Sequence, residues 1–154
     1  IIYNEQIIYT KKMRILKTGV NKINDALSIA GCLSLLTTLI GTKYFKQYKK
    51  TNVLFIEDIN EEPYRIDRML THLKNAGAFE NTKALFIDFN NCKPAPHNRG
   101  TLSIRQTLLD LFKNYNFPII EYPYFGHRKK RIVIPIGAKT EIDFTKNQLV
   151  FFGS

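Results

Sequence analysis

With 154 residues, 44% of them hydrophobic and 23% charged, the chain has the composition of a single globular domain that can bury its own core. A membrane-spanning segment is not expected, because the longest candidate, 30–40, contains Ser34, Thr37 and Thr38 and falls short of the roughly 18 residues needed. The net charge of +10 is compatible with nucleic-acid binding. The basic residues are scattered, however, and no RNP, zinc-finger or helix-turn-helix pattern accompanies them, so we favour a solvated basic surface.

Hydrophobic patterns predict alternating strands and helices in the middle of the chain and strands at its end. Residues 1–9 are interpreted as a hairpin or as the remnant of a larger unit. After them we predict strands at 13–20, 53–57, 82–89, 118–122, 132–136, 140–144 and 148–152. Helices are predicted at 31–40, 63–75 and 101–115, with a turn at 21–25 and a loop at 90–100. This order favours an α/β fold, a single layered domain with a mixed β-sheet flanked by helices.

Two features that could carry function have simpler structural interpretations. Residues 43–51 interleave aromatic residues with lysines, a pattern that can stack nucleic-acid bases. We favour the alternative, in which the rings pack on the core while the lysines face water. Cys32 and Cys92 are isolated and lack C-x-x-C spacing, so we predict two free thiols rather than a disulfide.

The best candidates for chemistry are a carboxylate and a histidine that each follow a predicted strand. Glu57 and Asp58 stand at the carboxyl end of the apolar run 53–56, and ligands of open α/β sheets bind beyond such ends. His127 stands behind Gly126, which lets a loop bend sharply and present an imidazole. Together these residue types indicate two members of a nucleophile–histidine–acid triad. The carboxylate would orient the imidazole, which would take a proton from the nucleophile.

Other candidate residues carry weaker signals. His72 lies on a predicted helix and His97 in a proline-rich loop, and exposure without function is expected for both. The acidic residues that follow Glu57 match no known metal-binding spacing, so we predict neither a metal nor a cofactor. No G-x-S-x-G elbow is present to supply a nucleophile. The chain contains four serines, none with elbow flanks: Ser28, Ser34, Ser103 and Ser154.

Four blocks of sequence carry a family resemblance. They are residues 56–70 (IEDINEEPYRIDRML), 31–36 with 39–42 (GCLSLL and LIGT), 125–127 (FGH) and 134–138 (IPIGA). In order and spacing, they resemble the LD-carboxypeptidase family, a serine peptidase group (family S66) that includes murein tetrapeptide carboxypeptidases and microcin C self-immunity proteins. The resemblance covers about 13–152.

The resemblance implies a fold, an activity and partners. Family enzymes have an N-terminal domain with the nucleophilic serine and a C-terminal, swivelling-type domain with the glutamate and histidine of the triad. The chain resembles the C-terminal domain, expected at 13–154, with 1–12 as a remnant of the interdomain segment. By motif position the triad residues are Glu57 and His127. The implied activity is cytoplasmic hydrolysis of the amide to a terminal D-amino acid in murein tetrapeptides, without a metal, by an enzyme that commonly forms homodimers.

Departures from the family pattern leave alternatives open. Ala30 replaces the first of two glycines, and Ile87 stands where a glycine is typical, which we expect to cost stability. The chain also begins at Ile1, so a split gene, a decaying gene and a cut chain all fit. We expect no useful turnover without a serine-bearing domain. The alternatives are a fragment of an antibiotic-immunity peptidase and a non-catalytic relic or interaction domain, and the sequence does not separate them.

Overall fold

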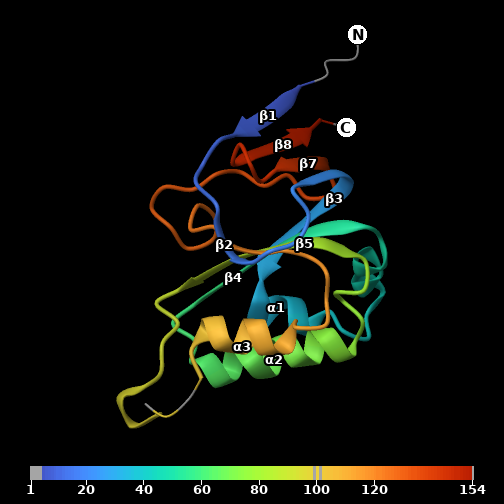
Figure 1. The fold of residues 1–154 in the computed structure, drawn as a ribbon. Helices are drawn as coiled ribbons and strands as arrows, with labels where there is room; N and C mark the ends of the chain where they lie inside the picture. The colour runs from blue at the N-terminus through green and yellow to red at the C-terminus, as the bar shows by residue number, and fades with distance from the viewer. Residues whose placement is uncertain (1–4, 99, 101, 154) are drawn as a thin grey trace.

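A single mixed β-sheet organises the molecule. The computed structural model describes residues 5–98, 100 and 102–153, and within them eight strands pair in the order β1-β8-β7-β3-β4-β5-β6-β2 (Figure 1). The central strands β3 to β6 are parallel, and antiparallel strands flank them on both sides. Their bounds are β1 (Gln6–Tyr9), β2 (Arg14–Lys17), β3 (Lys22–Cys32), β4 (Asn52–Ile59), β5 (Thr82–Asn90), β6 (Ile119–Glu121), β7 (Lys139–Asp143) and β8 (Gln148–Phe152). The predicted α/β class with a mixed sheet is confirmed.

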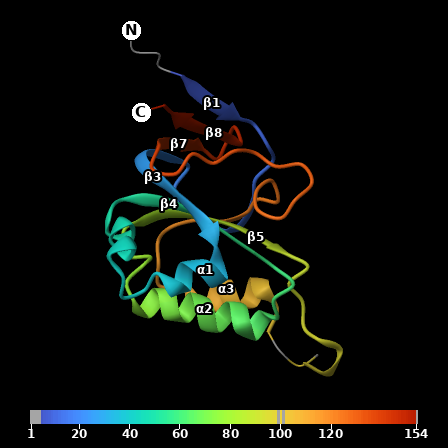
Figure 2. The same ribbon diagram turned by 180° about the vertical axis from the view of Figure 1, so that it is seen from behind.

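The helices lie together on one side of the sheet, away from β1, β7 and β8, as Figures 1 and 2 both show. They are α1 (Leu33–Thr38), α2 (Pro63–Asn75) and α3 (Ile104–Leu111), with two 3-10 turns, η1 (Lys43–Lys49) and η2 (Pro96–Asn98). Pro63 occupies the first turn of α2, where its missing N–H needs no partner. The Ser103 side chain accepts a hydrogen bond from the Gln106 amide and so caps α3. Leu54 and Ile56 of β4 pack among these helices in one hydrophobic core.

A second core fills the opposite face, because the sheet curls over on itself. Phe55 of β4 lies 6.0 Å from Phe151 of β8 between ring centroids, although these strands are three positions apart in the sheet. In a flat sheet that separation would be about 14 Å. Phe125, in the segment between β6 and β7, meets the Phe55 ring edge-on at 5.7 Å. The antiparallel end of the sheet and this segment therefore cover the face that no helix covers.

Three local predictions were wrong. Residues 132–136 form no strand, because Pro135 cannot donate to a ladder; Ile132 instead packs on the second core, and its amide bonds the Tyr124 carbonyl. Within the predicted turn 21–25, residues 22–25 are instead the start of β3, and Asp25, at φ 59°, marks a bulge where the register shifts. The first predicted helix starts later, since residues 31 and 32 complete β3.

The ends and the two glycine replacements also have clear positions. In the predicted N-terminal remnant, residues 1–4 lie outside the described residues, and β1 pairs with β8 along its whole length. The domain boundary after residue 12 stays a prediction. Ala30 and Ile87 both lie in strands and neither has a positive φ, so the backbone does not require glycine at either position. None of the helices in the described part of the chain combines the length and hydropathy that a bilayer span requires.

Asp143, at the end of β7, predicts a specific acid dependence of stability. Its Oδ1 accepts hydrogen bonds from the Thr145 hydroxyl and from the amides of Thr145 and Lys146, and Lys22 lies 3.2 Å away. These contacts, the Thr145 hydroxyl first, lower the pKa of Asp143 to about 2. A lowered carboxyl pKa adds stability above the ordinary value near 3.8, and this is lost as the pH falls toward about 2. Thermal melts should therefore show the gap between the wild type and Asp143→Asn closing over that range; a constant gap would contradict this.

Candidate functional site

Glu57 and Asp58 end the same strand but face opposite sides of the sheet. Side chains alternate along β4, so Glu57 shares the side of Phe55, in the second core, while Asp58 shares the side of Ile56, against the helices. In the parallel register Glu57 stands beside Asp88 of β5. The carboxyl ends of β4 and β5 therefore present two neighbouring carboxylates on the side that no helix covers.

The structure brings Glu57 and His127 into direct contact. The imidazole Nδ1 of His127 lies 2.7 Å from Oε2 of Glu57. The Glu57 side chain is 9% exposed, whereas that of His127 is 55% exposed. An anionic carboxylate accepts the proton of Nδ1, which leaves the Nε2 lone pair free. The pair is thus buried at the acid and open at the base, an arrangement suited to moving a proton from an incoming group.

Gly126 makes this contact possible. Its φ of +68° lies in the left-handed region, which side chains with a Cβ rarely adopt. A Cβ at this position would lie 2.6 Å from Cγ of Glu57 and 2.7 Å from its Oε2. The turn therefore presses glycine backbone against the glutamate and delivers the next residue, His127, to the carboxylate.

Asp58 has a structural task on the helix side. Its Oδ2 accepts a hydrogen bond from the Ser34 amide at 3.0 Å, in the first turn of α1, and a longer one from the Cys32 thiol. Its Oδ1 accepts from the Ile59 amide at 2.8 Å. The bond from Ser34 satisfies an amide that the start of α1 leaves without a partner inside the helix. The role of Glu57 rather than Asp58 as the acid that acts with His127 stays a prediction.

Sequence reasoning did not single out the residues that hold the turn around His127. Asn90 Nδ2 donates to the His127 carbonyl at 3.0 Å. Arg128 makes a two-pronged contact with Asp88, with Nε to Oδ2 at 2.8 Å and Nη2 to Oδ1 at 2.5 Å. This hydrogen bonding raises the pKa of Arg128 further above its ordinary value. One signal in the sequence could have pointed to Asp88. Like Glu57, it is an acidic residue near the carboxyl end of an apolar strand.

The remaining candidates lie elsewhere or have other partners. His72 and His97 are exposed, and Cys32 and Cys92 are free thiols, as predicted. Among the described residues no cluster of three or more potential metal ligands occurs. Each described serine makes a hydrogen-bond contact with the surrounding chain. Ser28 donates to the Pro135 carbonyl, Ser34 contacts the Cys32 thiol and Ser103 caps α3, while Ser154 lies outside the described residues.

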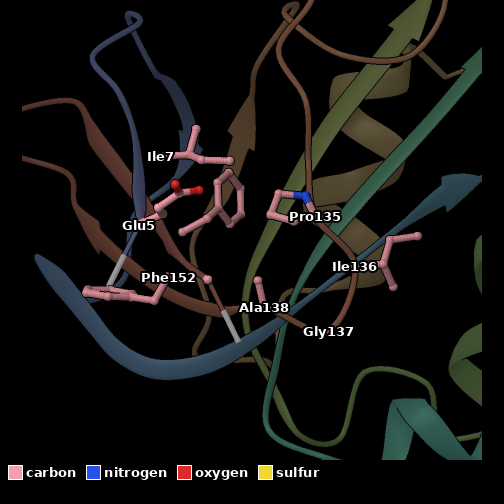
Figure 3. Close-up of a pocket in the computed structure, with 9 residues that line it drawn as sticks. Glu5, Ile7, Pro135, Ile136, Gly137, Ala138 and Phe152 are labelled. Carbon is pink, nitrogen blue, oxygen red and sulfur yellow. The ribbon is translucent and has the colours of Figure 1, made fainter. Parts of the chain in front are cut away.

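Two surface hollows need to be distinguished. A hollow of about 240 Å³ adjoins the site, and Glu57, Gly126, Ile132 and Ile134 are among the residues that line it. A second, of about 230 Å³, lies between β1, β8 and the segment before β7; Glu5, Pro135 and Phe152 line it (Figure 3). Neither Glu57 nor His127 lines the second hollow, whereas Glu57 and Gly126 both line the first, so the first is the hollow that adjoins the pair.

Comparison with known proteins decides the family. Residues 26–142 match the family model described as the LD-carboxypeptidase C-terminal domain. The chain belongs to the LD-carboxypeptidase family. A relative from Bacillus subtilis named "Probable murein peptide carboxypeptidase" is 35% identical over 146 residues, which cover 94% of this chain and 45% of the relative. The "Microcin C7 self-immunity protein MccF" of Escherichia coli is 23% identical over 127 residues, 79% of this chain and 35% of that protein.

Solved structures share the fold. The muramoyltetrapeptide carboxypeptidase from Oxalobacter formigenes superposes with a TM-score of 0.75 at 22% identity, covering 98% of this LD-carboxypeptidase domain and 50% of that chain. MccF in its inactive mutant apo state gives a TM-score of 0.76 at 19% identity, covering 99% and 42%. The chain thus spans half or less of the length of these proteins. It corresponds to the C-terminal domain of the LD-carboxypeptidases, and carboxypeptidases are hydrolases.

Proposed function

We propose that this LD-carboxypeptidase domain supplies the acid and the base of a Ser–His–Glu triad whose serine lies on another segment. The observation that carries the proposal is the 2.7 Å contact between His127 Nδ1 and Glu57 Oε2, with the imidazole exposed and the carboxylate buried. In the proposed roles Glu57 holds the ring orientation and stabilises its charged form, and His127 is the general base. The remote serine is the nucleophile, which makes the whole enzyme a serine-type carboxypeptidase.

The proposed reaction is acyl transfer in two steps. Nε2 of His127 takes the serine hydroxyl proton while the oxygen attacks the amide carbonyl carbon. The C–N bond then breaks, and Nε2 returns the proton to the departing amine of the terminal residue. A water molecule next gives a proton to Nε2 and attacks the ester carbon. The bond between this carbon and the serine oxygen then breaks, and Nε2 returns its proton to the serine oxygen, which frees the serine and the shortened peptide. Glu57 remains an anion throughout and offsets the positive charge that the imidazole carries between these transfers.

The proposed substrate is a murein tetrapeptide with a terminal D-amino acid, cleaved in the cytoplasm during peptidoglycan recycling. The name of the Bacillus subtilis relative and its 35% identity support this choice. A second candidate, an antibiotic-immunity peptidase, is supported by the match to MccF at 23% identity and by the shared fold. In either case the proposed partners are the serine-bearing segment and a second copy of the complete enzyme.

The test is to reassemble an enzyme. The chain is joined at its N-terminus to the N-terminal segment of the Bacillus subtilis relative, and D-alanine release from an L,D-tetrapeptide is measured for the chain alone and for the joined protein. We expect release from the joined protein only, since loss of one triad member lowers the rate by about 10⁴-fold or more. Full activity of the chain alone would overturn the assignment of the nucleophile, and a folded but inactive joined protein would overturn the proposed function.

A further inference from the structure

An ion pair between Asp88 and Arg128 stands beside Glu57 and His127. Asp88 is 2% exposed, and Arg128 binds both of its carboxylate oxygens. Two-pronged arginine–carboxylate contacts fix geometry as well as contributing energy, because two parallel N–H···O bonds form at once. The Asp88 carboxylate therefore fixes both the place and the orientation of the arginine side chain.

The two pairs are linked, because their acidic members are neighbours in the sheet and their basic members are neighbours in the turn. Glu57 and Asp88 are register partners on adjacent parallel strands, and their side chains share one side of the sheet. His127 and Arg128 are consecutive in the turn, and the Arg128 amide bonds the Gly126 carbonyl at 3.0 Å. Two successive residues of the turn are thus fastened to two successive strands of the sheet.

His127 depends on such fastening. Its side chain is 55% exposed, so little packing holds the ring apart from its one bond to Glu57. The backbone on its two sides is held at Gly126 by the close approach to Glu57 and at Arg128 by Asp88. A turn anchored at one point only could pivot, and a shift of about 1 Å at a catalytic group can lower a rate by about 10²-fold.

Arg128 also occupies a competing acceptor. Without it, Asp88 would be a nearly buried carboxylate next to Glu57, lacking the guanidinium and able to attract the imidazole N–H. Other charged groups around the turn are Glu121 on β6, which acts electrostatically on Arg128, and the exposed Lys129, Lys130 and Arg131. Arg131 donates to the Gly126 carbonyl at 3.3 Å, so it supports the turn without touching either carboxylate.

We propose that Asp88 and Arg128 are positioning residues, which hold His127 so that its Nδ1–H donates to Glu57 and to no other carboxylate. The catalytic meaning of this pair rests on the proposed function, but the positioning is a property of the chain itself. It can therefore be measured without substrate and without the serine-bearing segment.

The experiment is ¹⁵N and ¹H NMR of the His127 ring at about pH 8.5, above the ordinary titration range of imidazole. In the wild type we expect the Nδ1–H tautomer and a low-field Nδ1–H proton that exchanges slowly with water. Arg128→Gln and Asp88→Asn should each speed that exchange about tenfold or more, equal to about 1.4 kcal/mol of lost protection, and populate the other tautomer. Arg128→Lys keeps the charge but not the fork, so it should fall between the wild type and Arg128→Gln.

Two further variants make the outcome decisive. The double variant Asp88→Asn/Arg128→Gln lacks the same anchor and should exchange about as fast as the faster of the two single variants. Lys22→Gln breaks the ion pair with Asp143 at the start of β3, the end of the strand away from Glu57. Its His127 ring should exchange at the wild-type rate. Exchange and tautomer within twofold of the wild type in the folded single variants would overturn the proposal, whether or not the joined enzyme is active. If a single variant does not fold, Arg128→Lys and the double variant decide by the same criterion.

Discussion

Replacing Glu57 with glutamine in the joined enzyme should lower kcat for D-alanine release by about 10³–10⁴-fold, with little change in KM. The physical reason is the ring of His127, whose Nδ1–H needs an anionic acceptor to keep its tautomer and to stabilise the charged imidazolium. Glutamine is close in shape but neutral, and its amide can turn an N–H toward Nδ1 and favour the wrong tautomer. Steady-state kinetics of the purified variant would measure the effect.

Asp58→Asn is the matched control, because Asp58 directly follows Glu57 in the same strand and is also buried. Its oxygens bond the amides of Ser34 and Ile59, on the helix side of the sheet. An asparagine oxygen can still accept from the Ser34 amide, so the folded variant should keep its rate within about threefold, as expected for a residue outside the reaction. A larger loss for Asp58→Asn than for Glu57→Gln would reverse the assignment of the acid.

Gly126→Ala should separate Glu57 from His127 without touching either side chain's chemistry. The added Cβ would lie 2.6 Å from Cγ of Glu57, in a backbone conformation with φ +68°. The left-handed conformation alone costs about 1–2 kcal/mol for alanine. The overlap must then displace the carboxylate or the turn, and we expect about 10²-fold lower kcat from a shift of about 1 Å.

Gly137→Ala isolates the effect of backbone strain. Gly137 has nearly the same conformation, φ +81°, but no atom lies within 4 Å of the position its Cβ would take. Both variants should lose stability in thermal melts, Gly126→Ala the more because its Cβ also overlaps Glu57, and only Gly126→Ala should lose activity beyond its folded fraction. Equal activities for the two folded variants would show that the close approach to Glu57 has no bearing on the reaction.

Local chemistry made much of the site predictable from the amino-acid sequence. The apolar run before Glu57 predicted a buried strand whose carboxyl end carries an acid, and Gly126 predicted the sharp turn that presents His127. Both expectations depend on neighbours in the chain, where steric and hydrophobic rules are strong. The α/β class followed in the same way from the alternation of patterns.

Features that depend on distant residues were not predictable in this way. The curl that brings Phe55 against Phe151 arises from strand twist and core packing over the whole sheet. The partnership of Asp88 with Arg128 depends on register between strands and on where the turn lands, and neither is written in local spacing. Residues 132–136 have a strand-like composition, but they pack on the second core through Ile132 and Ile134 without pairing.

The central claim is that His127, held by Glu57, activates a serine on another segment. The most direct measurement is the rate at which a fluorophosphonate labels that serine in the joined enzyme, because the serine oxygen must lose its proton to displace fluoride. With the wild-type chain we expect rapid labelling, and with His127→Gln a rate lower by about 10³-fold or more. Equal labelling rates for the two folded proteins would contradict the claim.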